Sequence, residues 1–117
     1  MKLSILGLSI SLVLTTCLPL MAAPAHPAEG KGIRSENGDI ESLITFHNRS
    51  SESVKIYWLD YAGKRVLYKT LQSQEALAQI TFLTHPWLIT DTDGNAWHLY
   101  YADAQPRIIE IIAPAVR

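Results

Sequence analysis

Residues 54–70 read VKIYWLDYAGKRVLYKT, which is the pattern of two strands joined by a tight turn. Residues 54–61 carry apolar side chains on both faces of the predicted strand, as is typical of a strand that is buried centrally. Ala62-Gly63-Lys64 supplies the turn, and residues 65–70 form the returning strand. This hairpin predicts that the surrounding chain is built from β-strands.

The same rhythm continues on both sides of the hairpin, with short apolar runs separated by turn residues. We predict five further strands, at 42–47, 76–82, 86–90, 97–101 and 107–112. The fold class is therefore all-β, as a seven-stranded antiparallel β-sandwich. Alternation along the strands selects the inward-facing residues, which are Ile44, Phe46, Ile56, Leu59, Leu67, Leu77, Leu88, Leu99, Ile109 and Ile111.

The first 25 residues have the features of a secretory signal peptide. Lys2 precedes an apolar run from Leu3 to Leu14, and Ala23-Pro24-Ala25 has the form of a cleavage site. We expect an exported protein of bacterial type, periplasmic or secreted, whose mature chain begins near His26. An alternative is a lipoprotein leader acylated at Cys17. Residues 26–41 are then an extended lead-in, and residues 42–113 form the sandwich domain.

Charge and cysteine content narrow the possible functions. The 117 residues carry a formal net charge of −1, so no nucleic-acid partner is expected. The histidines outside the candidate site, at 26, 47 and 98, are scattered, and the single cysteine lies in the leader, so neither a metal nor another cofactor is expected. No phosphate loop or nucleophile elbow occurs, and we expect no enzyme.

Two indoles, a phenol, a hydroxyl and an imidazole lie within one short stretch: Trp58, Tyr68, Thr81, His85 and Trp87. Together they would make an apolar box with hydrogen-bonding groups, suited to a mostly apolar ligand group that bears one hydroxyl. Each residue also has a purely structural interpretation. The tryptophans can fill the core, the tyrosine can be an ordinary half-buried residue, and the histidine can cap the turn before Pro86.

The spacing of these residues resembles that of a known family, the β-domain of the von Hippel–Lindau tumour suppressor. The similarity runs without a gap over residues 33–91. The segments that carry it are Ile33-Arg34-Ser35 with Asn37, Phe46 with Asn48-Arg49-Ser50, Trp58-Leu59-Asp60-Tyr61-Ala62-Gly63, Tyr68-Lys69-Thr70-Leu71, and His85-Pro86-Trp87-Leu88.

The resemblance implies recognition of 4-hydroxyproline in a partner peptide, with a hydroxyl residue at Thr81 and a histidine at His85 bonding the ligand hydroxyl. Asn37, Ile80 and Phe82 are possible flanking contacts. The family has a histidine at position 80, a tyrosine at 82 and a basic residue at 39, where this chain has Ile80, Phe82 and Asp39. These differences would remove contacts to the parts of the family's usual partner peptide that flank the hydroxyproline.

Few residues follow the last predicted strand, so we expect a stand-alone β-domain without the family's helical α-domain. No ubiquitin-ligase partner and no transmembrane segment in the mature chain are then expected. The favoured function is an exported module that recognises a protein or an extended peptide containing hydroxyproline or proline. The alternatives are a structural or assembly domain of the cell envelope without a small-ligand pocket, and a sugar-binding domain.

Overall fold

The computed structural model describes residues 26, 29 and 32–115. The predicted leader and Cys17 lie outside these residues. Within them there is no helix, and hence none that is long and apolar enough to cross a membrane. The strands are β1 (Glu41–Asn48), β2 (Val54–Leu59), β3 (Arg65–Leu71), β4 (Ala76–Phe82), β5 (Pro86–Thr90), β6 (Ala96–Tyr101) and β7 (Arg107–Ile111).

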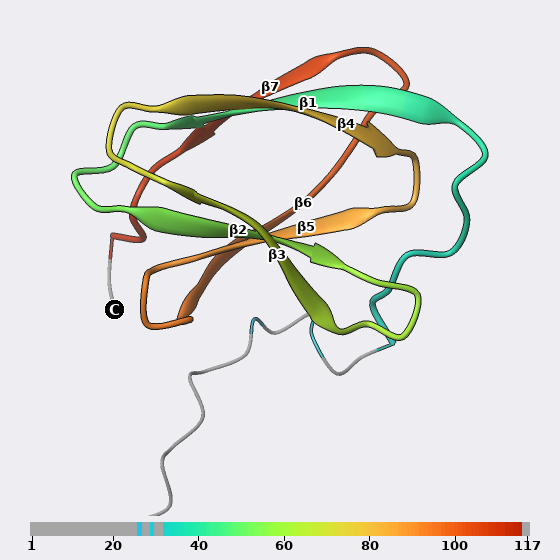
Figure 1. Ribbon diagram of the computed structural model, residues 1–117, viewed down its shortest axis with the longest axis horizontal. Helices are drawn as coiled ribbons and strands as arrows, with labels where there is room; N and C mark the ends of the chain where they lie inside the picture. The colour runs from blue at the N-terminus through green and yellow to red at the C-terminus, as the bar shows by residue number, and fades with distance from the viewer. Residues whose placement is uncertain (1–25, 27–28, 30–31, 116–117) are drawn as a thin grey trace, which may run out of the picture.

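The strands form two sheets that pack face to face (Figure 1). One sheet has the order β4-β1-β7, and the other has the order β3-β2-β5-β6. The predicted all-β sandwich is therefore confirmed, but its wholly antiparallel character is wrong at one pair, because β1 and β7 run parallel. β1 and β7 are separated in the chain by the five other strands, and such a long connection allows parallel pairing, which a hairpin does not.

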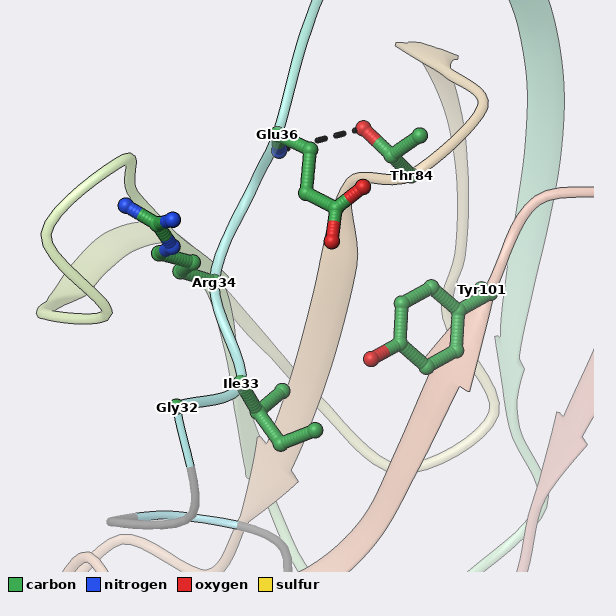
Figure 2. Close-up of a pocket in the computed structure, with 6 residues that line it drawn as sticks. All are labelled: Gly32, Ile33, Arg34, Glu36, Thr84 and Tyr101. Atoms are coloured by element: carbon green, nitrogen blue, oxygen red, sulfur yellow. Dashed lines mark hydrogen bonds between the residues drawn. The ribbon is translucent and has the colours of Figure 1, made fainter.

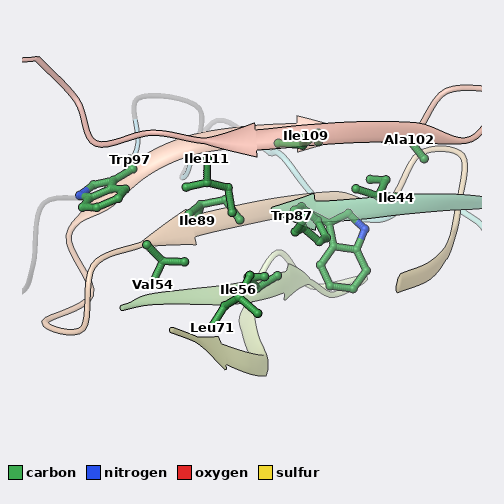
Figure 3. Packing of buried hydrophobic residues seen from close by; sticks show 11 residues of the cluster. Ile44, Val54, Ile56, Leu71, Trp87, Ile89, Trp97, Ala102, Ile109 and Ile111 are labelled. Carbon is green, nitrogen blue, oxygen red and sulfur yellow. The ribbon is translucent and has the colours of Figure 1, made fainter. Parts of the chain in front are cut away.

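The core lies between the sheets and is built from alternate residues of the strands (Figure 3). Ile44 of β1, Ile56 of β2 and Ile89 of β5 are completely buried. Phe46 packs against Trp87 with a centroid distance of 5.8 Å, which joins the two sheets. Burying each such side chain contributes about 1.5–3 kcal/mol, so this layer supplies most of the force that holds the sheets together.

Most of the predicted inward residues are buried, and Leu67 is the clear exception. Seven are fully or almost fully buried: Ile44, Phe46, Ile56, Leu59, Leu88, Ile109 and Ile111. Leu77 and Leu99 are partly exposed. Leu67 is 50% exposed because β3 contains a bulge: Ile56 lies opposite Lys69 and Tyr57 opposite Leu67, which leaves Tyr68 as the extra residue. The bulge reverses the alternation that the sequence suggested.

Residues 33–40, which we call the strap, run along one end of the sandwich from the start of β1 towards the turn after β2 (Figure 1). Ser35 N donates to Asp60 O at 3.1 Å, and Leu83 N donates to Ile40 O at 2.9 Å. Further towards the N-terminus, Glu29 pairs with Arg65 at 2.8 Å. The strap is thus fixed both to the end of β2 and to the turn between β4 and β5.

Candidate functional site

The five predicted site residues come together at the open side of the sandwich, between β3 and β4. Tyr68 of β3 packs edge-on against Trp87 of β5 at 4.9 Å and against Trp58 of β2 at 6.3 Å. Trp58 in turn packs against His85, in the turn between β4 and β5, at 5.3 Å. Thr81 of β4 is hydrogen-bonded to Trp87. We call these five residues the aromatic box.

Burial differs sharply within the box. Trp87 and Thr81 are 2% exposed and His85 is 6% exposed, whereas Tyr68 is 47% exposed. Trp58 is half-buried. Trp87 therefore belongs to the core and to the box at the same time, and the two interpretations of this residue are compatible. The exposed Tyr68 marks the side from which a ligand can approach.

The hydroxyl of Thr81 has a defined hydrogen-bond direction. Trp87 Nε1 donates to Thr81 Oγ1 at 2.8 Å. An indole nitrogen can only donate, so the threonine oxygen is the acceptor in this bond. The Thr81 hydroxyl proton remains able to donate to a further oxygen.

His85 is held from several directions by neutral groups. Its ring contacts Trp58, Tyr61 and Phe82, and its Nε2 lies 3.2 Å from the Tyr61 hydroxyl. Burial lowers the pKa of His85 below the ordinary 6.5, and a hydrogen bond with the backbone of Asn37 only partly opposes this shift. The imidazole is therefore neutral at pH 7, with one nitrogen that donates and one that accepts.

Two residues that we had not assigned to the site support it from the strap and from the turn after β2. Ser35 Oγ accepts a hydrogen bond from Trp58 Nε1 at 2.7 Å and donates to Leu59 O at 2.7 Å. Tyr61 packs edge-on against Trp58 at 5.6 Å. The sequence predicts a strand that includes Tyr61, but β2 ends at Leu59 and Tyr61 lies in the turn that follows. Had the predicted strand been ended at Leu59, Tyr61 would have been assigned to the turn.

The three possible flanking contacts are scattered around the box. Asn37 is exposed on the strap, and its backbone is bonded to Thr84 and to His85. Ile80 is 54% exposed and alternates with Thr81, so it lies on the opposite face of β4. Phe82 packs against His85 at 5.3 Å. Of these three residues, Phe82 is the one whose side chain packs against a side chain of the box.

A pocket of about 200 Å³ lies beside the strap and is separate from the box. Its lining, drawn in Figure 2, is Gly32, Ile33, Arg34, Glu36, Thr84 and Tyr101. Thr84 has a φ of 79°, which is unusual for a β-branched residue. Its hydroxyl accepts from the backbone of Glu36 and of Asn37 at 3.2 Å each and donates to Asn37 O at 3.1 Å. These bonds offset the strain and fix the strap next to His85.

The residues that could bind a metal are dispersed. In residues 26, 29 and 32–115, no three side chains of histidine, cysteine, aspartate or glutamate gather in one place.

The fold and the site define a class: a two-sheet β-sandwich with an aromatic box between two edge strands. Residues 33–103 match the family model described as VHL beta domain, which covers more than half of the chain. The chain therefore belongs to the VHL beta-domain family, and the resemblance noted in the sequence is confirmed. The VHL β-domain is a substrate-recognition module and not a known enzyme family, so its general function is to bind proteins or peptides.

The chain is also similar to a curated animal protein, Protein Vhl of Drosophila melanogaster. The two are 29% identical over 59 residues, which are 50% of this chain and 33% of the fly protein. The matched part thus spans about a third of that relative.

Proposed function

We propose that this protein recognises an extended peptide and binds a hydroxyproline or proline ring of that peptide in the aromatic box. The observation that carries the proposal is the meeting of Trp58, Tyr68, Thr81, His85 and Trp87 between the edges of β3 and β4. Aromatic faces suit the polarised C–H groups of such a ring. The two polar groups suit its hydroxyl.

The hydrogen-bond directions favour a hydroxyl over other polar groups. Thr81 already accepts from Trp87 and so offers its proton to a ligand oxygen. Neutral His85 offers an acceptor nitrogen to a ligand proton. A hydroxyl donates and accepts at once, whereas an unmodified proline ring offers no partner to the Thr81 hydroxyl proton or to the acceptor nitrogen of His85. An unmade hydrogen bond in a buried site costs about 1–3 kcal/mol, which corresponds to about tenfold or more in affinity.

The edge of β4 supports binding of the peptide backbone. Among the described strands, β4 pairs only with β1, so its other edge is open. Ala76–Phe82 contains no charged residue, proline or glycine, which are the usual devices that prevent strand addition. A peptide that adds to this edge places alternate side chains towards the box.

The test is a calorimetric titration of the protein with two peptides that differ only in proline or hydroxyproline. We expect the hydroxyproline peptide to bind at least about tenfold more tightly, and His85→Ala to reduce the difference to the part that Thr81 contributes. His47→Ala serves as the control, because His47 lies on β1 away from the box. Equal affinity of the wild-type protein for the two peptides would remove the mechanism.

We also propose that the protein is exported to the periplasm or secreted, since residues 1–25 have the form of a cleavable leader. Fractionation of bacterial cells and N-terminal sequencing of the recovered protein test this. A start near His26 supports cleavage by signal peptidase. Lipid attachment that is lost in Cys17→Ala would support the lipoprotein alternative instead.

A second candidate is an assembly domain, favoured by the apolar outer face of the β4-β1-β7 sheet. Ile80 and Ile108 are 54% and 73% exposed, and a hollow of about 320 Å³ lies beside Leu43 and Ile80. Sedimentation of Ile108→Lys against the wild-type protein distinguishes the two candidates. Loss of an oligomer in this variant would favour assembly, and an unchanged monomer would favour peptide recognition.

A further inference from the structure

Tyr61 is held rigidly by the turn between β2 and β3. Asp60 Oδ1 accepts from Ala62 N at 2.8 Å and from Lys64 N at 2.9 Å. Gly63 N donates to Asp60 O at 2.9 Å, and Gly63 adopts a φ of 80° that favours glycine. These bonds fix the backbone on both sides of Tyr61, and the contacts with Trp58 and His85 direct its ring, which is 48% exposed.

The Tyr61 ring covers one edge of the imidazole. It stands edge-on to His85 at 87° and 5.6 Å, and its hydroxyl lies 3.2 Å from His85 Nε2. The strap closes this corner at Gly38, where an added Cβ would lie 3.4 Å from the Tyr61 hydroxyl and 4.0 Å from His85 Nε2. Nε2 is therefore occupied from within the protein by the Tyr61 hydroxyl.

We propose that Tyr61 is a positioning residue, which accepts a hydrogen bond from Nε2–H of His85 and so keeps Nδ1 free of a proton. This inference rests on the proposed function. A neutral imidazole has only one N–H, so a proton on Nε2 makes Nδ1 an acceptor for the ligand hydroxyl. The backbone of Asn37 also hydrogen-bonds the ring. A carbonyl can only accept, so this bond agrees with the proposal if it is made to Nε2–H and opposes it if it is made to Nδ1–H. A proton on Nδ1 is the contrary arrangement.

The experiment compares the wild-type protein with Tyr61→Phe, which keeps the ring and removes the hydroxyl. Nitrogen NMR of the labelled imidazole at about pH 7.5 reports which nitrogen carries the proton. We expect the Nε2–H form in the wild-type protein and a mixture in Tyr61→Phe. The ratio of hydroxyproline to proline peptide affinity should fall by about threefold to tenfold, the worth of one hydrogen bond. Tyr101→Phe is the matched control, since this tyrosine is 38% exposed and lines the other pocket.

The outcomes separate this inference from the proposed function. An Nδ1–H imidazole in the wild-type protein, or an unchanged spectrum and peptide ratio in Tyr61→Phe, overturns the role of Tyr61. If the wild-type protein does not discriminate between the peptides, the proposed function fails. The NMR comparison without peptide still decides whether Tyr61 sets the proton on His85. A shift of that proton in Tyr61→Phe and not in Tyr101→Phe supports the inference.

Discussion

Replacement of Thr81 by valine tests the hydrogen bond at the centre of the site. Valine has almost the same shape as threonine but offers no acceptor to Trp87 Nε1, which lies 2.8 Å from Thr81 Oγ1. Both residues are 2% exposed, so water cannot replace the lost partner. A buried donor left without an acceptor costs about 1–3 kcal/mol, and we expect Thr81→Val to lose that much free energy of unfolding.

Urea unfolding followed by tryptophan fluorescence measures this loss. For a domain of this size, each kcal/mol lowers the melting temperature by about 4–8 °C, so calorimetry gives a second measurement. Thr81→Ser is the matched control, because it keeps the oxygen and removes one methyl group worth about 0.8 kcal/mol. It should lose less stability than Thr81→Val.

A double-mutant cycle with Trp87→Phe shows whether the loss comes from this bond. Phenylalanine has no donor, so the valine substitution should cost much less in that background. An equal cost of Thr81→Val with and without the indole would refute the hydrogen-bond assignment. A valine variant as stable as the wild-type protein would refute it as well.

Two other predictions concern His85 and the turn before β3. Because burial lowers the pKa of His85, this histidine takes up a proton at a higher pH in the unfolded chain than in the folded protein. The free energy of unfolding should therefore fall as the pH drops below about 6.5. In urea unfolding, His85→Gln should show a smaller loss between about pH 7 and pH 5 than the wild-type protein. A fall equally steep in the variant would exclude His85 as the source. Gly63→Ala should lose about 1–2 kcal/mol, because φ is 80° and the new Cβ would lie 3.0 Å from Ile33 O. Gly38→Ala, without positive φ, should be nearly neutral in the same calorimetric measurement, and a similar loss in both variants would contradict this explanation.

The strands were predictable because their signals are local. The seven predicted runs coincide with β1–β7 to within one or two residues at each end. The largest difference is at β2, which ends at Leu59 rather than Tyr61. There the carboxylate of Asp60 accepts hydrogen bonds from the backbone of the next turn, and this turn ends the strand. A pattern of apolar residues does not show such a bond between a side chain and the backbone.

The site was only partly predictable. The five box residues were identified together from their spacing, and the structure places them in one connected cluster. Their hydrogen-bond partners were not identified. Ser35 and Tyr61 lie 23 residues before Trp58 and 24 residues before His85 in the chain, and only the folded strap and turn bring each pair into contact.

The sequence by itself determined that this chain forms short strands with turns at glycine, asparagine and aspartate, because alternation and turn chemistry act over a few residues. Tertiary structure alone decided the parallel pairing of β1 with β7, the bulge at Tyr68 and the contact between Tyr61 and His85. These features depend on which distant segments meet when the two sheets bury their apolar faces. That choice is made by packing over the whole domain, and no local pattern encodes it.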